Sequence, residues 1–125
     1  MELDPLRAYL LKKKGVTEET PFGPEVLVFK VMAKLFALVA WQEKPLRISL
    51  KCDPELALTF RTRYKAVQPG YHLNKKHWNT VILDNTIPND VMLGMIDDSY
   101  DLVVKGLKKS VRKKLEHLEQ GGNHK

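Results

Sequence analysis

Three short hydrophobic segments follow one another between residues 25 and 51, separated by only a few polar or turn-forming residues. The first two, 25–31 and 35–41, are rich in Val, Leu and Phe and too short for ordinary helices. The third, 46–51, alternates strictly between apolar and polar residues, as a strand with one buried face does. Because parallel strands need a long crossover connection, connections this short predict antiparallel pairing.

Helical patterns flank these strands on both sides. Asp4-Pro5 and Asp53-Pro54 each supply a capping carboxylate followed by a proline suited to the first helical position. From Pro88 onward, apolar residues recur every three or four positions as far as Leu118, which predicts one continuous final helix. Residues 17–24 predict only turns, 67–70 a turn or short edge strand, and 78–83 a further strand.

The predicted fold class is therefore α+β: a two-layer α-β(3)-α-β(2)-α sandwich with an antiparallel sheet. A chain of 125 residues suits one domain, which we expect to span residues 1–118 and to end in a basic helix. Residues 119–125 are expected to form a polar, disordered tail. A single cysteine, Cys52, excludes an internal disulfide, and a chain of this length can fold without one.

The charge is unevenly distributed along the chain. The formal net charge is +6, which favours anionic partners. Residues 84–104 hold five acidic and no basic side chains, whereas residues 105–125 are strongly basic. That order suits a helix dipole and needs no functional explanation. The run 105–114 remains open between a solvated face, a phosphate-contacting helix end and a partner or membrane-surface helix.

Several classes of function lack their sequence signature. There is no glycine-rich phosphate loop, metalloprotease motif or nucleophile elbow, so we expect no enzyme and no cofactor, and no small-molecule substrate is identified. His72 and His77 enclose two lysines, which would repel a cation, so we expect no metal. The longest apolar run, 35–41, is too short to span a bilayer and the start is no secretory signal, so we expect a cytoplasmic protein without membrane contact. We also expect the protein to be a monomer.

The segment 68–81, QPGYHLNKKHWNTV, has the most unusual composition. Lysines suit phosphates, asparagines suit base edges, and aromatic rings suit base stacking. The same residues also suit a structural role, in which Tyr71 and Trp78 anchor the loop and the polar groups hold it. The composition alone leaves both interpretations open.

The sequence 69–81, PGYHLNKKHWNTV, resembles the signature of the MmcQ/YjbR family of small bacterial proteins. The strand-to-helix step at 46–56 and the sequence IDDSY at 96–100 extend the resemblance over about residues 4–107. The resemblance implies an α-β(3)-α-β(2)-α fold, related to frataxin-like and secretion-chaperone-like folds. It also implies DNA as partner, through a "double-wing" motif, and implies no enzyme activity.

On this resemblance, the hairpin 25–41 is the first wing and the turn 69–77 is the second. Wings read DNA grooves with a few basic side chains at their tips. The residues expected to bind nucleic acid are Lys30, Lys34, Arg47, Lys51, His72, Asn74, Lys75, Lys76, His77 and Asn79. The lysines and Arg47 would contact phosphates, and Asn74 and His77 would reach base edges.

Two alternatives stand beside DNA binding. The kinship with secretion chaperones and the amphipathic final helix suggest a protein-interaction module that does not bind nucleic acid. The kinship with frataxin suggests iron binding, for which Asp97, Asp98 and Asp101 are a small acidic cluster. We expect DNA binding to be the function.

Overall fold

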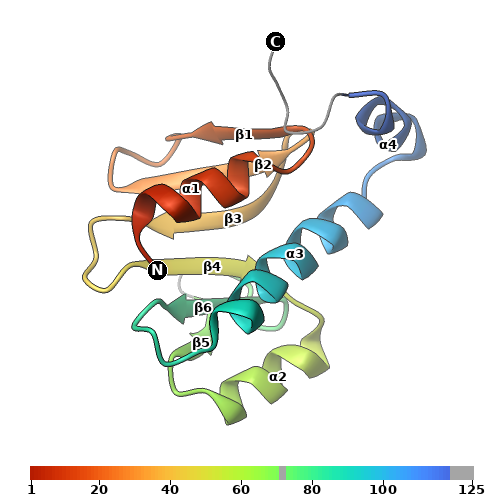
Figure 1. Ribbon diagram of the computed structural model, residues 1–125. Helices are drawn as coiled ribbons and strands as arrows, with labels where there is room; N and C mark the ends of the chain where they lie inside the picture. Colours follow the sequence, from red (N-terminus) through yellow and green to blue (C-terminus); the bar gives the residue numbers. More distant parts are fainter. Residues whose placement is uncertain (71–72, 119–125) are drawn as a thin grey trace.

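The computed structural model describes residues 1–70 and 73–118, which form four helices and one six-stranded sheet (Figure 1). The elements are α1 (Leu3–Leu11), β1 (Val16–Glu19), β2 (Val26–Val31), β3 (Lys34–Ala40), β4 (Arg47–Lys51), α2 (Pro54–Arg63), β5 (Val67–Pro69), β6 (Trp78–Ile82), α3 (Asn89–Lys105) and α4 (Lys109–Glu116). The strands pair antiparallel in the order β1-β2-β3-β4-β6-β5. No helix in the described part of the chain is long and apolar enough to cross a membrane.

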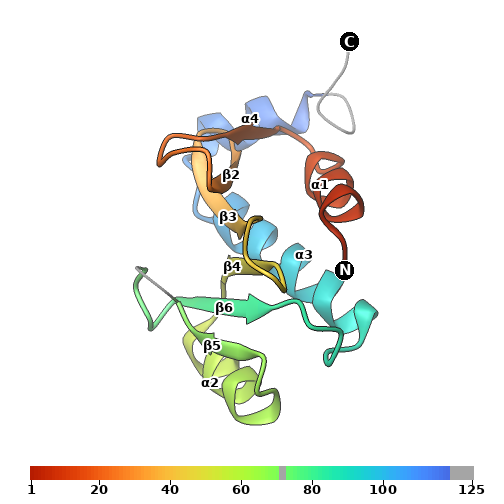
Figure 2. The same ribbon diagram turned by 90° about the vertical axis from the view of Figure 1, so that its left-hand side faces the viewer.

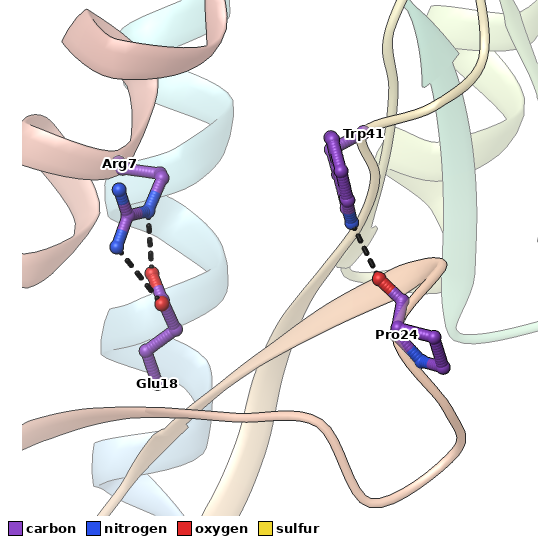
Figure 3. Close-up of polar contacts among 4 residues, drawn as sticks. All are labelled: Arg7, Glu18, Pro24 and Trp41. Atoms are coloured by element: carbon purple, nitrogen blue, oxygen red, sulfur yellow. Dashed lines mark hydrogen bonds and ion pairs between the residues drawn. The ribbon is translucent and has the colours of Figure 1, made fainter.

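Helices α1, α2 and α3 pack on one face of the sheet, which we call the inner face. Glu18 of β1 points to this face and receives two hydrogen bonds from Arg7 of α1 (Figure 3). Helix α3 crosses β3 and β4, and α2 lies against β5 and β6 (Figures 1 and 2). The two-layer α+β architecture predicted from the sequence is therefore confirmed.

Ser99 ties α3 to the centre of the sheet. Its hydroxyl is fully buried, donates to the Phe36 carbonyl (2.6 Å) and accepts the Lys51 N–H (2.9 Å). A register shift opposite Phe29 turns both Phe36 and Ala37 inward, and the Phe36 ring meets Tyr100 of α3 edge-on at 5.5 Å. The 96–100 sequence therefore has a structural role in joining the two layers.

The prediction from the sequence omits one strand and is wrong about one helix N-cap. Strand β1 falls where only turns were expected, because an edge strand reading Val-Thr-Glu-Glu carries too few apolar residues to show a strand pattern. It adds a fourth strand before α2. Asp53 caps α2 as predicted, by accepting the Leu56 N–H, but Asp4 lies inside the first turn of α1 and caps nothing.

The predicted continuous final helix is wrong. Helix α3 ends at Lys105, the backbone of Lys108 is extended, and α4 begins at Lys109. The break lets Leu107 and Leu115 enter the core, where they are 6% and 5% exposed. A straight helix would carry Leu115 past the end of the sheet, so burial of the apolar stripe outweighs the cost of interrupting the helix.

Candidate nucleic-acid interface

Both expected wings leave the sheet at the same end. The β2–β3 turn lies beside the start of β3, because Val31 pairs with Lys34. The loop before β6 lies beside the end of β4, because Lys51 pairs with Trp78. Strand β4 separates the two turns, and the strands on either side of it, β3 and β6, are about 10 Å apart at the usual strand spacing. Figure 1 shows the β2–β3 turn on the right, at the start of β3.

The β2–β3 turn has an unusual backbone. Met32 and Ala33 have φ values of 48° and 71°, both in the left-handed region. Two consecutive positive φ values characterise the tight hairpin turn whose twist matches that of the flanking strands. This turn places Lys34 in an exposed position at the tip of the hairpin.

Arg61 of α2 holds the loop before β6. Its Nε donates to Asn79 Oδ1 (2.7 Å), and its Nη2 donates to the carbonyls of Lys75 and, at 3.3 Å, of Trp78. The amide nitrogen of Asn79 in turn donates to the Ala57 carbonyl (3.3 Å). A guanidinium presents donors in a fixed fork, so one helical side chain fixes several backbone positions of this loop.

Gly70 permits a close crossing at the base of the same loop. Its N–H donates to the Trp78 carbonyl at 2.9 Å, and a Cβ at this position would lie 2.8 Å from the Trp78 Cβ. Across the loop, Asn74 Oδ1 accepts the Lys76 N–H and the Asn74 carbonyl accepts the His77 N–H. The described part of the loop is therefore held by its own hydrogen bonds as well as by Arg61.

Four of the expected phosphate contacts gather at this end of the sheet, which we call the four-lysine end. Its members are Lys34, Lys51, Lys75 and Lys76. Lys51 is half-buried and the other three are exposed. Within residues 1–70 and 73–118, none of the four forms an ion pair with a carboxylate. Exposed Asn74 and half-buried His77 lie in the same loop as Lys75 and Lys76.

The other expected residues lie elsewhere. Lys30 forms an ion pair with Glu19 at 3.1 Å, and Arg47 stands at the opposite end of β4 from Lys51. Asn79 is 4% exposed and its amide bonds within the protein, so it anchors the loop and has no access to a ligand. The remaining residue, His72, lies outside the described residues.

Cys52 and the acidic residues of α3 show no sign of a reactive or metal-binding site. Burial, followed by the charges of Asp98 and Asp53, raises the pKa of the Cys52 thiol to about 11, so the thiol is protonated at neutral pH. Asp97 accepts hydrogen bonds from Lys13 Nζ (2.5 Å) and Tyr9 Oη (2.7 Å). The described residues contain no group of three His, Cys, Asp or Glu side chains placed to hold a metal ion.

The sequence pattern does not identify Arg61 as a loop anchor. It shows only that Arg61 lies off the apolar face of its helix, as many solvated residues do. Its partners are 14 to 18 residues further along the chain. Sequence periodicity relates residues within one helix or strand. It does not predict that a helical side chain will bond to the carbonyls of a loop that lies beside the helix only in the folded protein.

Comparison with known proteins places this arrangement in one family. The YjbR family model matches residues 11–102. The chain is similar to Escherichia coli O157:H7 YbdF, with 41% identity over 76% of this chain and 78% of that one, and to E. coli K12 YjbR, with 36% identity over 94% and 100%. It also resembles the crystal structure of Deinococcus radiodurans DR2400, a DUF419 domain, with a TM-score of 0.87 and 41% identity over 98% of this chain and 96% of that one. The chain therefore belongs to the YjbR family.

Proposed function

We propose that the protein binds duplex DNA through the four-lysine end, with the β2–β3 turn and the loop before β6 as its two wings. The observation that carries the proposal is the gathering of four lysines, from three separate segments, without a carboxylate partner in the described chain. Lys75 Nζ also donates to the Gly70 carbonyl at 3.3 Å, which leaves its charge unneutralised. Cations at one end of the sheet without carboxylate partners create a positive field that attracts a polyanion.

Three other cations of the protein pair with carboxylates. Arg7 pairs with Glu18, Lys13 with Asp97, and Lys30 with Glu19, each at 3.1 Å or less. Within the described residues, the basic side chains of α4 also form no ion pair with a carboxylate. What distinguishes the four-lysine end is that its lysines come from three separate segments, two of which are the proposed wings.

The spacing of the wings also suits duplex DNA. The centres of the two turns are three strand spacings apart, or about 14 Å, which is comparable with the major groove, about 12 Å wide. Lysines at the tips would contact phosphates, while Asn74 and His77 flank Lys75 and Lys76 in the loop and would face base edges. We propose binding led by the phosphate backbone, with little sequence preference and no catalytic step.

The test is fluorescence anisotropy with a labelled duplex, titrated across salt concentrations. Four phosphate contacts predict a slope of log K against log salt of about −3.6. Replacing Lys75 and Lys76 together by Ala is expected to reduce the slope to about −1.8. The matched control is Lys44→Ala with Lys65→Ala, since both side chains are exposed and lie outside the four-lysine end. The control should leave the slope near the wild-type value.

Two results would overturn the proposal. One is the absence of binding at low salt, where electrostatic attraction is strongest. The other is an equal loss of slope in the Lys75/Lys76 variant and its control. Binding would then depend on the total positive charge of the protein and not on the four-lysine end. Capture of a protein partner that resists nuclease treatment would, together with the first result, favour an interaction module.

A further inference from the structure

The sheet face opposite the helices, which we call the outer face, contains a hollow of about 750 Å³. Small-molecule sites usually enclose about 300 to 1,000 Å³. Side chains from β2, β3, β4 and β6 form its floor, and the loops before β2, before β4 and before β6 contribute to its rim. Figure 2 shows the loops before β2 and before β6 projecting to the left, away from α1 on the right.

The floor of the hollow is divided into an apolar and a polar half. Leu35, Leu38 and Ala40 of β3 supply the apolar half. Across the strand pairing, Leu38 faces Ser49, which in turn faces Thr80. The hydroxyls of Ser49 and Thr80 lie 2.8 Å apart and form the start of the polar half.

Arg47 completes the polar half. It is two residues before Ser49 on the same face of β4, and it is exposed. Glu25 and Glu43 also line the hollow, yet within residues 1–70 and 73–118 no carboxylate lies within 4.0 Å of the Arg47 guanidinium. A guanidinium with no ion pair is suited to bidentate binding of a carboxylate from outside.

The wall formed by the loop before β2 is fixed by a hydrogen bond. Trp41 Nε1 donates to the Pro24 carbonyl at 2.7 Å, which ties this loop to the end of β3 (Figure 3). The loop carries Phe22, whose side chain lines the hollow and is 69% exposed. An exposed aromatic ring at the edge of an apolar floor gains burial when a hydrocarbon occupies the hollow.

We propose that this hollow binds a small amphipathic carboxylate. Its aliphatic body would lie on Leu35, Leu38 and Ala40, and its carboxylate would bind Arg47 beside the two hydroxyls. Glu25 and Glu43 also line the hollow and repel negative charge, so a polyanion such as nucleic acid is disfavoured here. Binding of a single carboxylate therefore depends on its direct pairing with Arg47. The inference does not depend on DNA binding, because Arg47 lies outside the four-lysine end.

Decanoate is a suitable probe, with isothermal titration calorimetry and protein NMR shifts as readouts. Decanol and decyltrimethylammonium share its chain but have neutral and cationic head groups. Decanoate is expected to bind at least about tenfold more tightly than either, because a charge-assisted pair with Arg47 is lost in both. The NMR shifts should centre on β3 and β4.

Variants separate the two halves of the site. Arg47→Gln is expected to weaken decanoate binding at least about tenfold and to abolish the preference for an anionic head. Leu38→Glu should abolish binding by placing a carboxylate on the apolar floor. Lys34→Gln is the matched control, since it removes one exposed cation at the other end of the sheet. The Lys75→Ala/Lys76→Ala variant should also keep full decanoate affinity.

Three results would overturn the proposal. Equal affinity for the three probes would exclude a role for the Arg47 charge, and this comparison uses the wild-type protein and needs no variant to fold. Unchanged decanoate affinity in Arg47→Gln would exclude the assigned head-group site. Dimerisation that Leu38→Glu abolishes, together with no decanoate binding, would show that a second copy covers the outer face.

Discussion

Single side chains decide how the loop before β6 is held, and Arg61 is the most important of them. Its guanidinium bonds to Asn79 and to two loop carbonyls. Without Arg61, the buried side-chain oxygen of Asn79, Oδ1, would lose its hydrogen-bond donor. Leaving a buried polar group unsatisfied costs about 1–3 kcal/mol.

Arg61→Leu is therefore expected to lower the free energy of unfolding by about 2 kcal/mol and to speed amide exchange at residues 73–78. Urea denaturation and hydrogen exchange measure the two effects. Arg63→Leu, on the same helix, is the control because Arg63 is exposed and its guanidinium interacts with the neighbouring Tyr64 and with no loop carbonyl in the described part of the chain. Equal effects of the two substitutions would argue against the anchoring role of Arg61.

Asp97 links α3 to α1 through a charge. Although burial alone would raise its pKa, the hydrogen bonds from Lys13 and Tyr9 hold the pKa of Asp97 below its ordinary value. The Lys13 ammonium also lies 5.1 and 5.2 Å from the ring centres of Tyr9 and Tyr100. Burial and the bond to Asp97 raise the pKa of Tyr9 to about 12.

A carboxylate whose pKa is lowered by folding stabilises the folded state above its ordinary pKa, and this stabilisation disappears as the pH falls. Asp97→Asn is expected to destabilise the protein by about 1 kcal/mol near pH 7, a value discounted for partial exposure of the Asp97 side chain. The difference from wild type should shrink as the pH falls below about 4. Denaturation curves from pH 2 to 7 test this; a constant difference would contradict it.

At the scale of secondary-structure elements, the apolar pattern of the C-terminal region does not predict where one helix ends and the next begins. Apolar residues recur through α3 and α4 as if they formed one helix, yet the chain turns after Lys105. The turn brings Leu115 of α4 against the start of β1, where a Cβ on Gly15 would lie 2.5 Å from the Leu115 Cδ1. Helix α4 therefore contributes to the core through one face, with Leu115 buried and Val111 packed against the core.

Leu115→Ala is expected to lower the free energy of unfolding by about 2–4 kcal/mol, since Leu115 is 5% exposed. Leu118 follows on the same stripe but is 42% exposed, so Leu118→Ala should cost about 0.5 kcal/mol or less. Thermal and urea denaturation of both variants compare the two positions. Similar losses would show that α4 does not dock as described.

At the scale of the whole molecule, all described helices that cover the sheet lie on its inner face. Cys52 directly follows β4 and lies beneath α2 and α3. The residue is 9% exposed, and its backbone N–H donates to the His77 carbonyl. Its thiol ionises with a pKa of about 11. Both burial and protonation protect it, so its modification requires the layers to separate.

Labelling of Cys52 with a disulfide reagent at pH 8 is thus expected to be slow in the native protein. The rate should rise with urea in parallel with global unfolding, because a thiolate is the reactive form and opening exposes it. Glutathione under the same conditions is the reference thiol. Rapid, complete labelling without urea would contradict the burial of this residue.

Much of this protein follows from its sequence alone. The strands within residues 25–51 and the helix capped by Asp53 are predictable because burial and capping impose local patterns on neighbouring residues. The connections between these strands are too short for parallel pairing, so the sequence also predicts the antiparallel α+β class. The sequence 69–81 is identified by its resemblance to the YjbR signature. The signature further indicates which residue types gather in the loop before β6.

Only the tertiary structure decided what those residues do. Asn74 and Asn79 are five positions apart in one signature, yet the first is exposed and the second is an internal anchor of Arg61. Likewise, the pairing of β4 with β3 and β6 places Arg47 over an open hollow, at the other end of the strand from Lys51. Local sequence encodes which face of an element is buried, whereas side-chain partners depend on which distant segments the sheet brings together.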